Sequence, residues 1–104
     1  MILGTAESVN GVPIRLTDER WEHILDSRPY LRNYEENVLD TIEAPDLVLR
    51  AAGGASVAVT AHGRNGFLHV VYREINRSDG FVITAYFKDS YNRRQVTWRA
   101  NEQK

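Results

Sequence analysis

Cysteine is absent from this 104-residue sequence, so neither a disulfide framework nor a thiolate metal site can form. Long apolar runs are absent too, because no stretch approaches the roughly 18 residues of a membrane helix, and we expect no membrane contact. Metal-ligand spacings such as His-x-x-x-His, glycine-rich phosphate loops and dinucleotide fingerprints do not occur. We therefore expect no metal and no cofactor. Residues 1–11 lack the basic start and apolar run of a signal peptide, and we expect the protein in the cytoplasm.

Lysine is scarce, with two lysines against eleven arginines, and the charges are unevenly distributed. Residues 1–48 hold 4 basic and 10 acidic side chains, whereas residues 49–104 hold 9 basic and 4 acidic side chains. The planar fork of arginine suits bidentate phosphate contacts. The net charge of −1 argues against a nonspecific nucleic-acid coat. The basic half is therefore either a specific phosphate-binding surface or an ordinary solvated surface with biased codon usage.

The first part of the chain predicts a hairpin followed by two helices, within a single domain of residues 1–104. Residues 1–16 contain Asn10-Gly11, a strong hairpin signal, and Pro13 should place its strand at an edge or keep it very short. Residues 17–45 hold two amphipathic segments. Thr17 is the expected N-cap of the first helix, and a capping box from Asn33 to Glu36 is expected to begin the second.

From residue 46 the hydrophobic period changes to two, which indicates strands near 47–51, 56–62, 67–75, 81–88 and 95–98. The turn signals between them are Gly53-Gly54, Asn65-Gly66 and Asp79-Gly80. Short turns of this chemistry join neighbouring antiparallel strands. The predicted fold is therefore α+β: two N-terminal helices packed on a four- to five-stranded antiparallel meander sheet over residues 46–98.

Side chains alternate across each strand, so the sequence also predicts two faces for the sheet. The strand residues expected to pack on the helix residues Trp21, Ile24, Leu25, Val38 and Ile42 are Val57, Val59, Leu68, Val70, Phe81 and Ile83. The other face is then open and carries Thr60, His62, His69, Arg73, Thr84, Tyr86 and Lys88.

The residues expected on the open face suit the cleavage of RNA by its own 2′-hydroxyl. Histidine is matched to proton transfer near neutral pH, and a cation stabilises the charge that develops on the phosphate. An aromatic ring on an open sheet can stack an unpaired base. An antiparallel sheet with one wet face always shows some polar row, however, so an ordinary surface is the alternative for each of these residues.

Four runs of the sequence carry a resemblance: IRLTDERWEHI at 14–24, VLDTIEAP at 38–45, VVYRE at 70–74 and GFVITAY at 80–86. With these runs the chain resembles the small phage-type nucleases of the barnase–EndoU–colicin–RelE superfamily and uncharacterised cyanobacterial-type proteins near them. The resemblance covers most of the chain, from about residue 14 to 98. It implies two helices on an antiparallel sheet, metal-independent ribonuclease activity, and toxin-like use beside a neutralising partner.

The resemblance places the family's helix histidine on His23, its sheet arginine on Arg73 and its strand threonine on Thr84. Relatives often read His-Ile-Leu-x-x-His-Pro, whereas this chain carries Arg28 at the second histidine position. The general base therefore stays open between His23 and His69. By helical geometry His23 points away from the apolar stripe, so an ordinary surface position is its alternative, while Arg28 should reach the sheet edge as an anchor or a phosphate ligand.

Two functions follow as hypotheses. The first is a metal-independent, toxin-like ribonuclease with catalytic residues His23, His69, Arg73, Thr84 and Tyr86, and with substrate-binding residues Arg28, Thr60, His62, Lys88, Arg93 and Arg94. The second is a non-enzymatic module that binds a protein or RNA with the same face, which the apolar residues Phe67, Val71 and Ile75 favour. The partners expected are RNA, an acidic antitoxin-like protein, or a second copy of the chain. Basic and aromatic residues alternate near the C-terminus and could contact RNA: Tyr91, Arg93, Arg94, Trp98 and Arg99. A structural role is the alternative for these residues, with Trp98 in the core and the arginines paired with the acidic helices.

Overall fold

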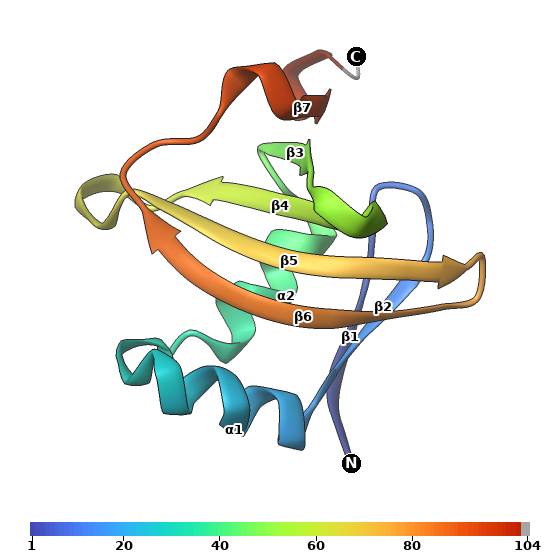
Figure 1. Cartoon of the computed structure of the whole chain (residues 1–104), viewed down its shortest axis with the longest axis vertical. Coiled ribbons are helices and arrows are strands. Elements are labelled where there is room, and N and C mark those ends of the chain that lie inside the picture. Colours follow the sequence, from blue (N-terminus) through green and yellow to red (C-terminus); the bar gives the residue numbers. More distant parts are fainter. Residues whose placement is uncertain (103–104) are drawn as a thin grey trace.

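Seven strands form one mixed sheet in the computed structural model, which describes residues 1–102 (Figure 1). In order across the sheet these are β1 (Ile2–Glu7), β2 (Pro13–Thr17), β6 (Asp79–Lys88), β5 (Phe67–Asn76), β4 (Ser56–Ala61), β3 (Leu47–Arg50) and β7 (Val96–Arg99). Neighbours are antiparallel except β2 and β6, which are parallel. Helices α1 (Asp18–Ser27) and α2 (Glu35–Glu43) pack on one face. The α+β class is confirmed, but the sheet of four or five antiparallel strands is wrong, because the N-terminal hairpin joins the same sheet.

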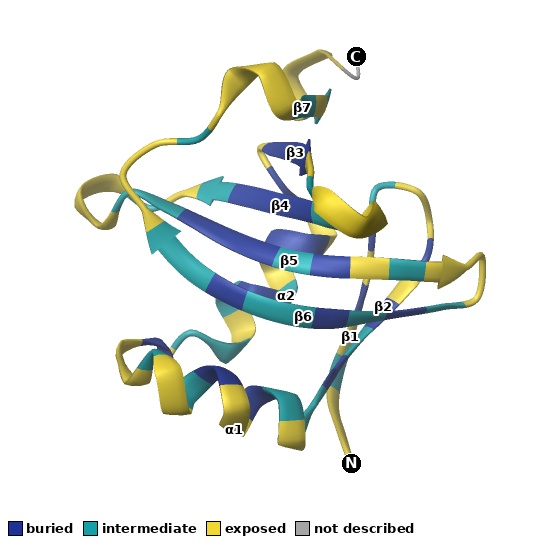
Figure 2. Cartoon of the chain, viewed as in Figure 1, coloured by how far each residue is buried: buried dark blue, intermediate teal, exposed yellow. Residues whose placement is uncertain are grey.

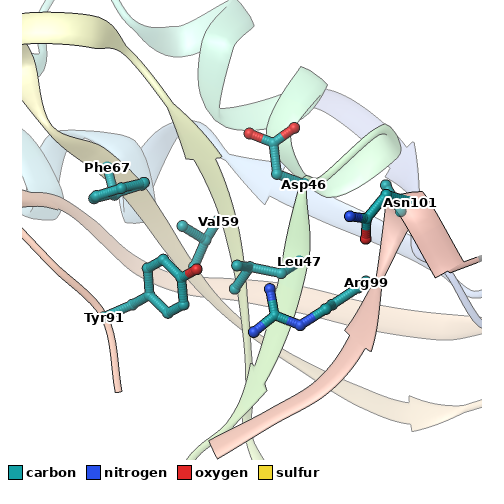
Figure 3. Close-up of a pocket in the computed structure, with 8 residues that line it drawn as sticks. Asp46, Leu47, Val59, Phe67, Tyr91, Arg99 and Asn101 are labelled. Carbon is teal, nitrogen blue, oxygen red and sulfur yellow. The ribbon is translucent and has the colours of Figure 1, made fainter. Parts of the chain in front are cut away.

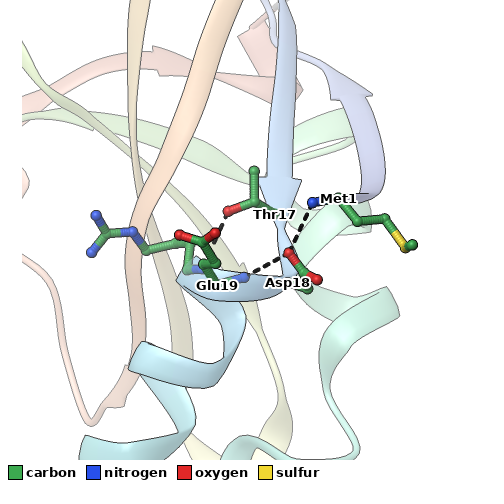
Figure 4. Close-up of polar contacts among 5 residues, drawn as sticks. Met1, Thr17, Asp18 and Glu19 are labelled. Carbon is green, nitrogen blue, oxygen red and sulfur yellow. Dashed lines mark hydrogen bonds and ion pairs between the residues drawn. The ribbon is translucent and has the colours of Figure 1, made fainter.

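Helix α1 begins as the sequence predicts (Figure 4). The side chain of Thr17 accepts a hydrogen bond from the backbone N–H of Arg20 at 3.2 Å. Asp18 and Glu19 lie in the first turn, where the helix dipole favours negative charge. The N-terminal ammonium of Met1 lies 3.1 Å from the carboxylate of Asp18 and lowers the pKa of that carboxyl group. The N-cap prediction for Thr17 is confirmed.

Helix α2 begins later than the sequence predicts, at Glu35. Tyr34 is its N-cap residue and makes no side-chain capping bond, so the capping box from Asn33 is wrong. The cause is the connection between the helices, where Pro29–Leu31 forms a short 3₁₀ turn and the N–H of Tyr34 bonds the carbonyl of Leu31 at 2.8 Å. Leu31 is fully buried, and this anchored turn holds Asn33 outside the helix.

Strand β2 lies inside the sheet, between β1 and β6, which corrects the prediction that Pro13 marks an edge. Pro13 pairs with Glu7 of β1, and the parallel pairing with β6 starts only at the next residue, Ile14. The missing N–H of the proline therefore falls outside the ladder that β2 shares with β6. The strand is five residues long, an ordinary length, so the very short strand that was the other expectation for Pro13 is not found either.

The close approach of β2 to β6 depends on Gly80, which sits opposite Ile14. A Cβ at this position would clash with the end of the Ile14 side chain and lie 2.7 Å from the carbonyl oxygen of Arg73. The predicted turn at Asp79-Gly80 is therefore wrong. Asn76 pairs with Asp79, so the two-residue turn falls at 77–78, and Gly80 serves strand packing instead.

Both faces of the sheet carry clusters of buried apolar side chains, and many residues of β4 and β5 are buried (Figure 2). Under the helices, Trp21, Ile24, Val38 and Ile42 pack with a set that shares one side of the strands: Ala58, Leu68, Val70, Tyr72, Val82 and Ala85. A second cluster on the other face joins Leu47, Leu49, Val57 and Val59 to Phe67, Val71, Tyr91 and Val96. The prediction for Leu68 and Val70 is confirmed.

Four of the predicted core positions lie elsewhere, for two physical reasons. Val57 and Val59 pack on the face away from the helices, because Ala58 between them is also apolar and alternation alone could not choose a side. In β6 the register shifts, so that Tyr72 pairs with Val82 and Val71 with Thr84. This bulge gives the helix side to Val82 and Ala85 rather than to Phe81 and Ile83.

Within residues 1–102, neither α1 nor α2 has the length and apolar character needed to cross a bilayer.

Candidate functional site

One aromatic ring, that of Tyr86, gathers four side chains on the sheet face away from the helices. His69 is its partner across the β5–β6 ladder, and their rings stack with centroids 5.1 Å apart and planes 21° apart. The guanidinium of Arg28 lies 5.4 Å from the centre of the Tyr86 ring, and the ammonium of Lys88 lies 6.0 Å from it. Arg28 Nη1 is also 3.4 Å from Thr84 Oγ1. We call these five residues the Tyr86 cluster.

The fold assembles this cluster from two neighbouring strands and a helix end. Alternation puts Thr84, Tyr86 and Lys88 on one side of β6. Strand β2 pairs with β6 only at Gly80 and Phe81, so the rest of β6 has no second strand beside it in the described sheet. Arg28, the C-cap residue of α1, reaches the cluster across this uncovered edge.

His69 combines burial with one available nitrogen. Its exposed fraction is 2%, and its Nδ1 lies 3.0 Å from the backbone carbonyl oxygen of Phe67. Since a carbonyl only accepts, Nδ1 carries the proton and Nε2 is left as the acceptor. Nε2 makes no hydrogen bond with residues 1–102, and it is not fully enclosed, because no fully buried side-chain N or O atom in these residues lacks a partner.

The surroundings of His69 also set its charge. Burial lowers the pKa of His69 and the positive charge of Lys88 lowers it further, although the hydrogen bond to Phe67 acts in the opposite direction. The ring is therefore neutral at neutral pH. A neutral imidazole whose Nε2 has no partner within residues 1–102 can take a proton, and the two cations at the Tyr86 ring can hold an anion.

Thr60 and His62 lie on the helix face, so their predicted place on the open face is wrong. Thr60 Oγ1 is 2.8 Å from Thr41 Oγ1 of α2 and 3.1 Å from His62 Nε2. The ring of His62 meets Tyr34 and Phe87 edge-on. Thr60 and His62 lie on this face because Ala58 is buried under the helices, and alternate residues along β4 point to the same face of the sheet.

Four other predicted site residues stay outside the Tyr86 cluster or at its margin. His23 is exposed on α1 and lines a shallow hollow of about 370 Å³ with Thr17, Glu19 and Arg20. Arg73 is exposed four residues beyond His69 on the same strand, which is roughly 13 Å at the rise of a β-strand. Arg93, with Arg94, is exposed in the short turn Arg93–Gln95 and makes no ion pair with residues 1–102.

A groove beside the cluster was missed by sequence reasoning (Figure 3). It measures about 300 Å³, and its lining comes from β3, β4, β5 and the C-terminal segment: Asp46, Leu47, Val59, Phe67, Tyr91, Arg99, Ala100 and Asn101. A meander would have placed β7 beside β6, whereas β7 pairs with β3 at the far edge. The chain therefore crosses the open face and forms one wall of the groove. The long polar segment after Lys88 was the only sequence signal for this crossing.

Within residues 1–102, no three His, Cys, Asp or Glu side chains are grouped to share a metal ion. The fold and the site together define an α+β protein with two helices on one face of a mixed sheet and a cationic, histidine-containing cluster on the other. Comparison with protein-family models found no match, and comparisons with curated proteins and with solved structures found none either.

Proposed function

We propose that this protein binds RNA at the Tyr86 cluster and cleaves it, without a metal ion, through attack by the RNA's own 2′-hydroxyl. One observation carries the proposal: His69, with its lowered pKa, stacks on the same ring that Arg28 and Lys88 approach. A proton acceptor and two cations thus each lie within 6.0 Å of the centre of one ring. The resemblance to small phage-type nucleases supports the same reaction class.

The proposed step assigns a role to each member. His69 Nε2 takes the proton of the 2′-hydroxyl, and the oxygen forms a bond to phosphorus. The bond between phosphorus and the 5′-oxygen breaks, and that oxygen receives the phenolic proton of Tyr86. The products are a 2′,3′-cyclic phosphate and a free 5′-hydroxyl, after which proton exchange with water restores both residues. Arg28 and Lys88 stabilise the charge that develops on the phosphate oxygens.

The remaining candidates take supporting places in this proposal. Thr84 orients Arg28 through their contact at 3.4 Å. Arg73, on the same face further along β5, would hold a more distant phosphate. A neutralising protein would be acidic and would cover Arg28 and Lys88, which accords with toxin-like use.

Binding without cleavage is the second candidate, and a protein partner or a second copy is less well supported. Phe67 and Val71 are half-buried against Tyr91 and Val96, so the chain itself covers part of the apolar area that favoured such a partner. Ile75, 53% exposed, is the member of that set that stays in solvent.

The test is an incubation of purified protein with labelled RNA in excess EDTA. We expect cleavage to a cyclic phosphate, with a rate that rises as pH passes through a value below 6.5, because the base works only when it is unprotonated. His69→Gln should abolish the reaction, and Arg28→Ala should slow it by a factor on the order of 100. His62→Gln, on the opposite face of the sheet, is the matched control and should cleave normally. An inactive wild type, or a His69→Gln variant of equal rate, would contradict cleavage.

A further inference from the structure

The groove beside the Tyr86 cluster has the composition of a site for a flat aromatic ligand (Figure 3). Leu47 and Val59 form an apolar floor, and both are buried. Phe67 and Tyr91 stand at one side, with ring centroids 5.2 Å apart and planes at 84°. This edge-to-face contact fixes the Tyr91 ring, so a flat ligand would meet a wall that is already oriented.

Asp46 and Asn101 place polar atoms at one end of the groove, and the guanidinium of Arg99 lies beside Leu47 (Figure 3). Asp46 Oδ2 accepts a hydrogen bond from the N–H of Ala61 at 2.8 Å, which fixes the carboxylate. Its Oδ1 makes no hydrogen bond with residues 1–102 and can accept one from an amino or imino group. Asn101 adds an amide beside it. An aromatic wall, an apolar floor and an end that reads N–H groups together match a nucleobase better than a lipid or an aliphatic side chain.

The groove is also at the right separation from the cluster. Val59 pairs with His69 across the β4–β5 ladder, and Phe67 pairs with Lys88 across the β5–β6 ladder. Neighbouring strands lie about 4.8 Å apart, so the groove begins one strand away from Lys88, one of the two cations proposed to hold phosphate. The base and the phosphate of one nucleotide are joined through a single sugar, and they need sites that are close together in this way.

The size of the groove limits what it can hold. At about 300 Å³ it is at the low end of the range for small-molecule pockets. A paired base carries its partner and the neighbouring stack with it, and this space has no room for them. An unpaired base can enter alone.

We infer that this groove binds one unpaired nucleobase, that of the nucleotide whose phosphate lies at Arg28 and Lys88, with the base stacked on Tyr91. The inference rests on the proposed function, because it needs RNA at the Tyr86 cluster, but it does not need cleavage. It defines the substrate class as single-stranded RNA in which one base is splayed out of any stack.

The test measures the fluorescence anisotropy of a short labelled single-stranded oligonucleotide in its 2′-O-methyl and 2′-deoxy forms, neither of which can be cleaved through a 2′-hydroxyl. Tyr91→Ala should weaken binding by about 5- to 150-fold, the range for loss of one stacked base. Tyr91→Phe keeps the ring and should bind as the wild type does. Tyr30→Ala removes an exposed ring elsewhere in the structure and is the matched control.

A set of oligonucleotides that each lack one base tests the stacking directly. One abasic position should weaken wild-type binding, and at that position Tyr91→Ala should cause no further loss. Three outcomes would contradict base binding in the groove. These are equal affinity of wild type and Tyr91→Ala, an additive loss at every abasic position, and no binding of either uncleavable form. Tyr91-dependent binding by a protein that does not cleave RNA would support base binding in the groove and contradict only the proposed cleavage.

Discussion

His69 and Tyr72 are both buried, and the structure shifts their pKa values in opposite directions. Burial lowers the pKa of His69 and raises the pKa of Tyr72 to about 12. Each shift favours the neutral form, because charge is costly away from water. His69 belongs to the proposed site, whereas Tyr72 lies in the core under the helices. The His69 imidazole therefore links the stability of the protein to pH in the range where the proposed reaction works.

The depressed pKa of His69 predicts a specific loss of stability on acidification. The unfolded chain protonates this histidine near 6.5, while the folded protein resists protonation until a lower pH. The free energy of unfolding should therefore decrease as pH falls below about 6.5, and the loss should stop below the folded-state pKa. Urea denaturation at a series of pH values measures it.

The control for this prediction is the exposed histidine of α1. His69→Gln should flatten the decrease, since the side chain no longer titrates, whereas His23→Gln should leave it in place. Asp18 does not interfere, because its pKa is lowered from 3.8 and its contribution is lost only at more acidic pH. Identical pH profiles for wild type and His69→Gln would show that the burial of His69 does not govern this window.

Among the elements, the pairing of β2 with β6 is the one most sensitive to a single atom. A Cβ at Gly80 would press on Ile14 and on the backbone of Arg73. Gly80→Ala should therefore lower the free energy of unfolding by about 1–3 kcal/mol, the usual range for overpacking. Gly4→Ala is the matched control, because there the Cβ meets only the flexible end of Leu39. Equal midpoints of thermal unfolding for the two variants would contradict this account of β2.

Local chemistry made most of the elements predictable. Thr17 capped its helix as expected, and strands β3 to β7 fall within a few residues of their predicted positions. The sidedness of β4 was not predictable, since Val57, Ala58 and Val59 are all apolar and only the packing of α2 selects Ala58. The parallel contact of β2 leaves no local signal either, because it joins segments far apart in the chain.

In the candidate site, too, local patterns predicted some residues, whereas tertiary contacts determined the rest. His69, Thr84, Tyr86 and Lys88 were predicted together, because each follows from alternation within one hairpin. Arg28 was predicted to reach the sheet edge, and it does. The groove could not be predicted in this way, because it depends on the path of the chain after Lys88. Tertiary contacts determine that path, and no local sequence pattern indicates it.

At the scale of the whole molecule, few of the charged side chains in residues 1–102 pair with one another. Two ion pairs join charged groups within residues 1–102, Met1 with Asp18 and Arg15 with Asp79. Neither involves Arg93 or Arg94, so these arginines do not meet the acidic helices, as the structural alternative required. They lie between β6 and β7, on the segment that carries Tyr91.

Replacement of both Arg93 and Arg94 by alanine should weaken RNA binding without loss of thermal stability, since both side chains are exposed. The salt dependence of the affinity should flatten by about 0.7 per lost phosphate contact on a single strand. Anisotropy titrations at several salt concentrations measure this slope. Arg32→Ala, exposed between the helices, should leave it unchanged. A less stable double variant with an unaltered slope would assign the two arginines to structure.

The parallel contact between β2 and β6 has a consequence for folding of the chain during its synthesis. Ile14 and Gly80 are 66 positions apart, the longest separation among the strand pairings of this sheet. Closing so long a loop is entropically costly until other contacts hold its ends. Because synthesis runs from the N-terminus, β1 and β2 leave the ribosome long before β6 exists. Until then the inner edge of β2 has no neighbour, and a nascent or truncated chain that stops short of Gly80 presents that edge to whatever it meets.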